Sequence, residues 1–200
     1  MSTGPAYRLP VMGRIVMAMS VSLDGYMEAP GHDLSWQLVD EELHDHFNAE
    51  LAPMSAFLDG RVTWELMAGY WPTADEDPSS SRPEKEFARI WRDMPKLVYS
   101  RTLTEAGWNT RIVREVVPGE VRELAEASSG DLAVGGARLG AAFRRHGLID
   151  EYRLYVHPVA IGAGTPLFDP ADGPLALSQT GSRTFGNGVV ELRYVPRPPA

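Results

Sequence analysis

Short apolar runs alternate along the chain with segments whose apolar residues recur every three to four positions. The apolar runs occupy 14–23, 55–60, 96–100 and 131–134, and the helical patterns occupy 40–51, 61–70, 84–94, 119–127 and 137–146. Short apolar runs bounded by turn residues predict strands, and a period near 3.6 residues predicts amphipathic helices. The alternation is typical of βαβ units, so we predict an α/β fold with a largely parallel sheet.

The first helical pattern also carries a start signal. Asp40 precedes it as a plausible N-cap, and Leu43, Phe47 and Leu51 share one face. The proline-bounded polar segment 71–83 is predicted to be a loop within the domain, and whether it moves as a lid is left open.

The last quarter of the chain changes character. Segments 150–162, 175–185 and 188–196 are strand-like, and the short connection Gly186-Asn187-Gly188 predicts a hairpin between the last two. We therefore expect a sheet that begins parallel and ends antiparallel.

Composition limits the number of domains and the compartment. With 200 residues and 44% hydrophobic content, we predict one domain over 13–196, preceded by a flexible extension over 1–12. No apolar run is long enough to span a membrane, and the start lacks a signal-peptide core. The chain has no cysteine, which excludes disulfides, thiolate metal sites and cysteine nucleophiles, and we expect a cytoplasmic protein.

Charge restricts the class of partner. The net charge of -8 and a pI near 5.1 argue against a nucleic-acid-binding surface, because a phosphate backbone would be repelled. A local arginine cluster still permits a small anionic ligand. The pair His44 and His46 suggests no metal site, since residues two apart on a helix point in different directions.

Three strand-to-helix junctions carry groups that bind anions. They are "DGRVTWE", with Gly60, Arg61 and Thr63; "VYSRTL", with Ser100 and Arg101; and "VGGARLG", with Gly135 and Gly136. Open α/β sheets bind ligands beyond the carboxyl ends of their strands. The paired glycines before a helix suggest close approach of an anion to the backbone. Together, the three junctions provide enough donors for a dinucleotide.

These segments resemble a known family. The order "SLDGY", "GRVTWE", "VYSRTL", "VGGARL", "HPVAIGAGTPLF" and "RTFGNGVVELRY", from Gly13 to Tyr194, is similar to the dihydrofolate reductase-like superfamily, in the branch of the riboflavin-biosynthesis reductase (RibD C-terminal) domain. The resemblance implies a three-layer αβα sandwich around a mostly parallel sheet with antiparallel C-terminal strands. It also implies NADPH as cofactor and a homodimer.

The resemblance also implies roles for individual residues at the cofactor. The "GRxTWE" segment would lie beside the pyrophosphate, Ser100 and Arg101 would contact the adenosine 2′-phosphate, and the glycine pair would cover the pyrophosphate. The implied cofactor residues are Gly60, Arg61, Thr63, Ser100, Arg101, Val134, Gly135, Gly136, Ala137, Arg138 and Leu139.

The substrate side is less determined. In folate reductases an acid on the first helix lies five residues after a tryptophan, and counting from Trp36 gives Glu41, whereas matching Phe47 to the family's helix aromatic gives Leu43. In the riboflavin branch the "SLDG" aspartate, Asp24, lies near the nicotinamide. Asp24 and Glu41 are therefore the candidate catalytic acids, and Trp36 a candidate wall of the substrate pocket.

The expected function is an NADPH-dependent reduction of a small heterocycle such as a pterin or pyrimidine, with no metal ion and no nucleic-acid or membrane partner. Two alternatives stay open. One is the pyrimidine reductase step of riboflavin synthesis, and the other is a non-catalytic module that binds NADPH or senses a ligand.

Overall fold

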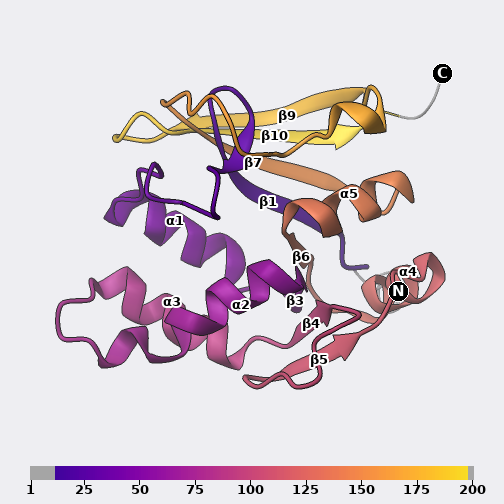
Figure 1. The fold of residues 1–200 in the computed structure, drawn as a ribbon, viewed down its shortest axis with the longest axis horizontal. Helices are drawn as coiled ribbons and strands as arrows, with labels where there is room; N and C mark the ends of the chain where they lie inside the picture. Colours follow the sequence, from indigo (N-terminus) through magenta and orange to yellow (C-terminus); the bar gives the residue numbers. More distant parts are fainter. Residues whose placement is uncertain (1–11, 198–200) are drawn as a thin grey trace, which may run out of the picture.

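The computed structural model describes residues 12–197, so the predicted extension lies outside the described residues apart from Met12, which is exposed. Eight strands form the main sheet: β1 (Ile15–Ser22), β3 (Ala56–Gly60), β4 (Lys96–Tyr99), β5 (Thr110–Val113), β6 (Leu132–Gly135), β7 (Glu151–His157), β9 (Leu177–Thr184) and β10 (Val190–Pro196). Their order is β5-β4-β3-β6-β1-β7-β10-β9, which places β5 and β9 at the two edges (Figure 1).

The sheet is parallel from β5 through β7, and β10 then pairs antiparallel with both β7 and β9. This confirms the predicted parallel sheet with an antiparallel C-terminal end. The hairpin is confirmed as well, because Gly188 donates its N–H to the carbonyl of Phe185 between β9 and β10 and has a positive φ of 86°.

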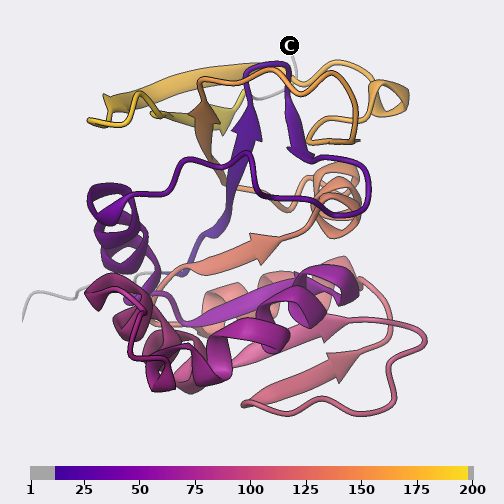
Figure 2. The same ribbon diagram turned by 60° about the vertical axis from the view of Figure 1, so that its left-hand side comes forward.

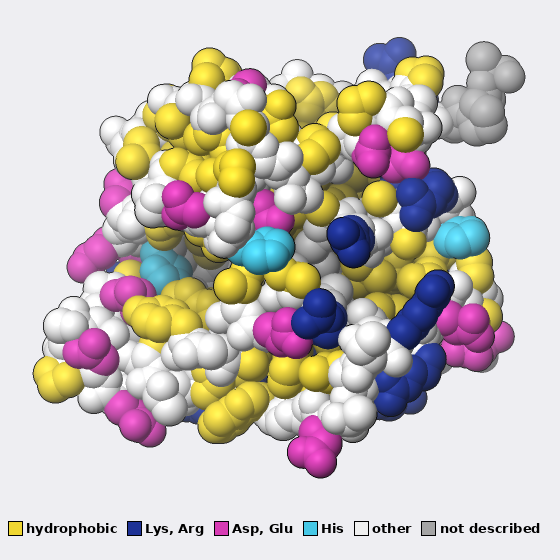
Figure 3. Space-filling model, in the orientation of Figure 1, with side chains coloured by type: hydrophobic (Ala, Val, Ile, Leu, Met, Phe, Trp, Pro, Cys, Tyr) yellow, Lys and Arg dark blue, Asp and Glu magenta, His cyan; other side chains and the backbone are white. Residues whose placement is uncertain are grey.

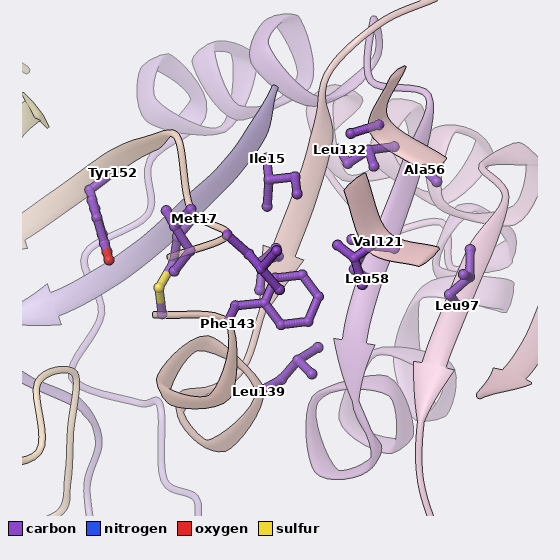
Figure 4. Close-up of a cluster of buried hydrophobic side chains, with 14 of the residues drawn as sticks. Ile15, Met17, Ala56, Leu58, Leu97, Val121, Leu132, Leu139, Phe143 and Tyr152 are labelled. Atoms are coloured by element: carbon purple, nitrogen blue, oxygen red, sulfur yellow. The ribbon is translucent and has the colours of Figure 1, made fainter. Parts of the chain in front are cut away.

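Helices cover both faces of the sheet. On one face lie α4 (Pro118–Ala127) and α5 (Ala137–Arg145), and on the other lie α1 (Glu41–Leu51), α2 (Arg61–Tyr70) and α3 (Arg82–Asp93). Figure 4 shows part of the core between the sheet and the helices α4 and α5, where Leu139 and Phe143 of α5 meet the strand residues Ile15, Met17 and Leu58. The predicted three-layer arrangement is therefore present.

Two helix starts follow directly from local sequence. Asp40 accepts a hydrogen bond from the backbone N–H of Leu43, as predicted for an N-cap. Ser81 and Glu84 form a reciprocal capping box, so α3 begins two residues before the predicted start of the helical pattern.

The expectation of a loop over 71–83 is wrong for its first half. Residues Trp71–Glu76 form a 3-10 helix, η1. Arg92 of α3 binds both oxygens of Asp75 at 2.6 and 2.7 Å and the carbonyl of Pro72 at 2.8 Å. Side chains from α3 therefore hold a segment whose polar composition suggested a loop.

Several short elements were not predicted. They are the edge strand β5, the small pair β2 (Tyr26–Glu28) and β8 (Thr165–Pro166), and the 3-10 turn η2 (Pro170–Asp172). Each has too few residues for a period to be visible in the sequence. In the described part of the chain, no helix is both long and apolar enough to cross a bilayer.

Candidate functional site

Two neighbouring strands lead into helices on opposite faces of the sheet. β3 ends at Gly60 and continues into α2, whereas β6 ends at Gly135 and continues through Gly136 into α5. β3 and β6 are parallel neighbours, with Asp59 opposite Gly135, so both junctions lie side by side at the carboxyl ends of the strands. We call this side of the sheet the carboxyl edge. Figure 2 shows β6 entering α5 on the side toward which the arrowheads of β4 and β5 point. Such a crevice is the usual ligand site of open α/β sheets.

The contact between these junctions requires both glycines. Gly136 has a φ of +95°, and a Cβ atom on it would lie 2.6 Å from Oγ1 of Thr63 and 3.8 Å from the backbone nitrogen of Gly60. A Cβ atom on Gly135 would overlap the carboxylate of Asp59. Packing of the chain against itself therefore already explains the pair, which the sequence had suggested was needed for close approach of an anion.

The helices α2 and α5 begin without a capping side chain. Gly60 and Gly136 occupy their N-cap positions, and neither first turn contains an acidic residue. By contrast, α1 and α3 are capped by Asp40 and Ser81 and carry acids in the first turn. Free N–H groups at the positive end of a helix dipole attract anions. Both helix starts that meet at this edge are therefore open to an anion.

Arginine side chains add positive charge near this edge. Arg61 forms an ion pair of 2.7 Å with Glu65, one helical turn further on. Arg101 and Arg138 are exposed, and within residues 12–197 neither forms an ion pair. Figure 3 shows Lys and Arg side chains gathered around α5 and the ends of β4 and β5. A chain of net charge -8 thus presents a locally basic surface here.

The other predicted cofactor residues differ in what they can offer. Ser100 is buried, and its Oγ accepts hydrogen bonds from the backbone N–H groups of Leu103 at 2.9 Å and Thr102 at 3.3 Å, which leaves its proton to donate. The side chains of Val134 and Leu139 lie in the core. Only the backbone groups of those two residues are available to a ligand.

Sequence reasoning missed Asp59. Its side chain is buried at the end of β3, and burial raises its pKa to about 7, against the opposing effect of the Lys96 ammonium group. Lys96 itself donates to the carbonyls of Met94, at 2.7 Å, and Trp91. A carboxylate directly after the apolar run "AFL" was the available signal.

Asp24 lies at the carboxyl end of β1 and accepts three hydrogen bonds. They come from the hydroxyl of Ser22 at 2.6 Å and from the backbone N–H groups of Gly162 at 2.7 Å and Ile161 at 3.2 Å. The Ser22 hydroxyl and these two N–H groups hold the pKa of Asp24 below its usual range. This carboxylate is therefore ionised at neutral pH and fixes the loop after β7.

Trp36 is brought against a histidine that the sequence did not single out. The indole and the imidazole of His157 stand edge to face, with ring centres 5.4 Å apart. Nδ1 of His157 accepts the backbone N–H of Leu38 at 3.0 Å, while its Nε2 is buried and has no hydrogen-bond partner within residues 12–197. Burial lowers the pKa of His157, so the imidazole is neutral and carries its proton on Nε2. Glu41 is exposed at the first residue of α1.

The histidine pair of α1 makes different contacts. His44 packs against the rings of Trp71 and Phe87, and Nε2 of His46 lies 3.4 Å from a carboxylate oxygen of Glu191. Across residues 12–197, no group of three or more acidic or histidine side chains is arranged to hold a metal ion.

Comparison with known proteins agrees with this architecture. The RibD C-terminal domain family matches residues 14–191. The Bacillus subtilis (strain 168) protein YyaP is 33% identical over 182 residues, which cover 90% of this chain and 94% of YyaP.

Solved structures share the fold at lower identity. A Shewanella sp. PV-4 protein named for riboflavin biosynthesis has a TM-score of 0.70 and 21% identity, covering 94% of this chain and all of that one. A Thermotoga maritima diaminohydroxyphosphoribosylaminopyrimidine deaminase/5-amino-6-(5-phosphoribosylamino)uracil reductase has a TM-score of 0.62 and 13% identity, covering 93% of this chain and 57% of that one. The match to the family model over nearly all of the described residues, together with the relative YyaP, shows that this chain belongs to the RibD C-terminal domain family.

Proposed function

We propose that the protein is an NADPH-dependent reductase that transfers hydride to a small heterocyclic substrate. The observation that carries this proposal is the convergence of two uncapped, acid-free helix N-termini, those of α2 and α5, at one edge of the sheet. Backbone donors of this kind suit a diphosphate, which two such helix starts can bind from both sides. Membership of the family supports the same conclusion.

The residues at the edge fit the cofactor group by group. Gly60 and Gly136 would present backbone N–H groups to the diphosphate, and the Thr63 hydroxyl lies beside Gly136. Ser100 and Arg101 would bind the 2′-phosphate, since one retains a free hydroxyl proton and the other an exposed guanidinium group.

NADPH held by these residues would supply the hydride for reduction of an electron-poor carbon of the substrate. Trp36 would form one wall of the substrate site. Asp24 and Glu41 are the candidate proton-handling groups. The depressed pKa of Asp24 makes it better suited to orienting a substrate donor or an ordered water than to donating a proton.

A second candidate is the pyrimidine reductase step of riboflavin synthesis, which the name of the Thermotoga neighbour favours. A third is a module that binds NADPH without catalysis. A homodimer and a cytoplasmic location remain part of this proposal, and light scattering on the purified protein measures the first.

Two measurements separate these functions. Calorimetric titration with NADPH tests the cofactor site. NADPH oxidation with dihydrofolate, dihydropterins and the riboflavin pyrimidine intermediate tests turnover. Turnover of a ring substrate would support the reductase and identify its branch, tight NADPH binding without turnover would favour the sensor, and failure to bind NADPH would refute the proposal.

A further inference from the structure

The loops at the carboxyl ends of β1 and β7 interlock into one surface. Ser22 pairs with His157 between the two strands, Leu23 donates its N–H to the carbonyl of Val159 at 2.7 Å, and β2 pairs with β8 beyond them. We name segments 22–42 and 157–176 the substrate-side loops, because they surround Trp36 and Asp24.

The substrate-side loops contain no lysine or arginine. Segment 22–42 instead carries the acidic residues Asp24, Glu28, Asp33, Asp40, Glu41 and Glu42. Its histidine, His32, is paired with Glu28 at 2.9 Å. Arginines that reach the loops from outside are engaged: Arg183 binds Glu42 at 3.1 Å, and Arg144 and Arg145 both bind Asp172.

The helix start beside these loops is closed to anions. Asp40 caps α1 by accepting the N–H of Leu43 at 2.9 Å, and Glu41 and Glu42 occupy the first turn. A carboxylate cap uses the donors that a phosphate would need and repels the phosphate charge. This is the opposite of the arrangement at the starts of α2 and α5.

The loops also expose large apolar side chains. Leu23 is 70% exposed, and Leu34, Leu38 and Val39 are also exposed around Trp36. Behind Trp36, the buried Nε2–H donor of His157 has no partner among the described residues. A flat, mostly apolar ring matches these exposed apolar side chains, whereas the Nε2–H of His157 is buried beneath the indole of Trp36 and does not reach the surface.

We propose that the substrate of this site is a neutral or positively charged ring that carries no phosphate group. The inference rests on the reductase function proposed above and specifies its substrate class. It separates this chain from the pyrimidine reductase alternative, whose named substrate bears a phosphoribosyl group. The phosphates of the cofactor would thus meet a basic surface, and the phosphate-free substrate ring would meet an acidic surface of the same molecule.

Matched pairs of ligands that differ only by a phosphate test this inference. The probes are riboflavin against FMN, and 5-amino-6-(5-phosphoribosylamino)uracil against its dephosphorylated form. Each probe is titrated by calorimetry into the protein with and without saturating NADP⁺, which permits binding without turnover. We expect the phosphate-free member of a pair to bind at least roughly tenfold more tightly, because the phosphate meets acidic side chains and no lysine or arginine of the substrate-side loops.

A charge-adding variant checks that electrostatics is the cause. Leu34→Arg places a cation within the substrate-side loops and should reduce the preference for the phosphate-free probe by at least roughly threefold. Met12→Arg adds the same charge at an exposed position before β1, at the opposite end of the strand, and should leave the preference unchanged.

The outcomes are distinct. Equal or tighter binding of the phosphorylated probes would overturn the inference, and so would a protein that binds NADPH but none of the four rings. Loss of NADPH binding would instead refute the proposed reductase, while the preference among rings would still be measured in the titrations without cofactor.

Discussion

Two aspartates at the ends of strands are placed in opposite environments. Asp24 accepts hydrogen bonds from a hydroxyl and two backbone N–H groups, and its pKa is lowered. Asp59 is buried beside Thr63 and Gly135, and its pKa is raised to about 7. Both precede a glycine in the sequence, so the difference comes from their surroundings alone.

The raised pKa of Asp59 predicts a pH-dependent stability. Between pH 4 and 7 the folded protein keeps a proton on this carboxyl that the unfolded chain has released, so the free energy of unfolding falls as pH rises through this window. Asp59→Asn removes the titration. We expect the free energy of unfolding of the variant, measured by urea unfolding, to fall less than that of the parent between pH 5 and pH 8.

Asp24→Asn provides the matched comparison with the opposite sign. Its carboxylate is favoured in the folded state, so its contribution is present at neutral pH and is lost as pH falls through the lowered folded pKa. The Asp24→Asn variant should melt at a lower temperature than the parent at pH 8.

The outcome for Asp59 is separate from this. Parallel pH profiles of stability for the parent and Asp59→Asn would contradict the placement of a buried titrating carboxyl at the end of β3.

Arg101 provides a test of cofactor preference at one side chain. If its guanidinium group binds the 2′-phosphate, Arg101→Ala should weaken NADPH binding by roughly 10- to 150-fold, as for loss of a charge-assisted hydrogen bond, and leave NADH nearly unchanged. Dissociation constants for both cofactors measure this. Arg89→Ala, an exposed change on α3, is the control. Equal weakening of both cofactors would make Arg101 a structural residue.

At the scale of elements, the segment between α2 and α3 is held more firmly than its composition suggests. Pro72 and Ala74 of η1 are buried, and the two terminal nitrogens of the Arg92 guanidinium group donate to the two carboxylate oxygens of Asp75. The capping box of α3 then fixes the chain on the other side at Ser81. These contacts argue against free movement of 71–83 as a lid.

Replacing the guanidinium group of Arg92 tests whether it anchors η1. Arg92→Lys keeps the charge but cannot bind Asp75 with two nitrogens, so it should lower the melting temperature and speed amide exchange over 73–76. Arg82 lies on α3 like Arg92 but forms an exposed ion pair with Asp45 of α1. Arg82→Lys should therefore change the melting temperature and the amide exchange less. Rapid amide exchange over 73–76 already in the parent would instead show that the segment opens on its own.

At the scale of the whole molecule, charge differs between two neighbouring regions at the carboxyl ends of the parallel strands. The starts of α2 and α5 offer donors and nearby arginines, whereas the loops after β1 and β7 offer acids and apolar side chains. The net charge of -8 describes neither region. At physiological salt, charges interact mainly within about 8 Å, so a ligand responds to the local groups.

Much of the architecture could be predicted from the sequence because it depends on local patterns. The helical period of 40–51, its Asp40 cap and the glycine-flanked hairpin at Asn187 are contained in a few consecutive residues. The strand-to-helix junctions at Gly60 and Gly135 were also visible in the sequence. The prediction of a third at Ser100 is wrong, because β4 is followed by a loop and the strand β5 and not by a helix. Short elements such as β5 were not, because four residues with no clear alternation carry too little pattern.

The sequence by itself determined the longer helices and strands and the order in which they follow one another. Only the tertiary structure decided the environments of side chains, because these depend on residues far apart in sequence. Burial against β6 sets the raised pKa of Asp59, and the loop at Leu38 leaves His157 with one unpaired nitrogen. The same holds for Gly136, whose conformation and lack of a side chain are required by Thr63 on another helix, a contact that no local pattern encodes.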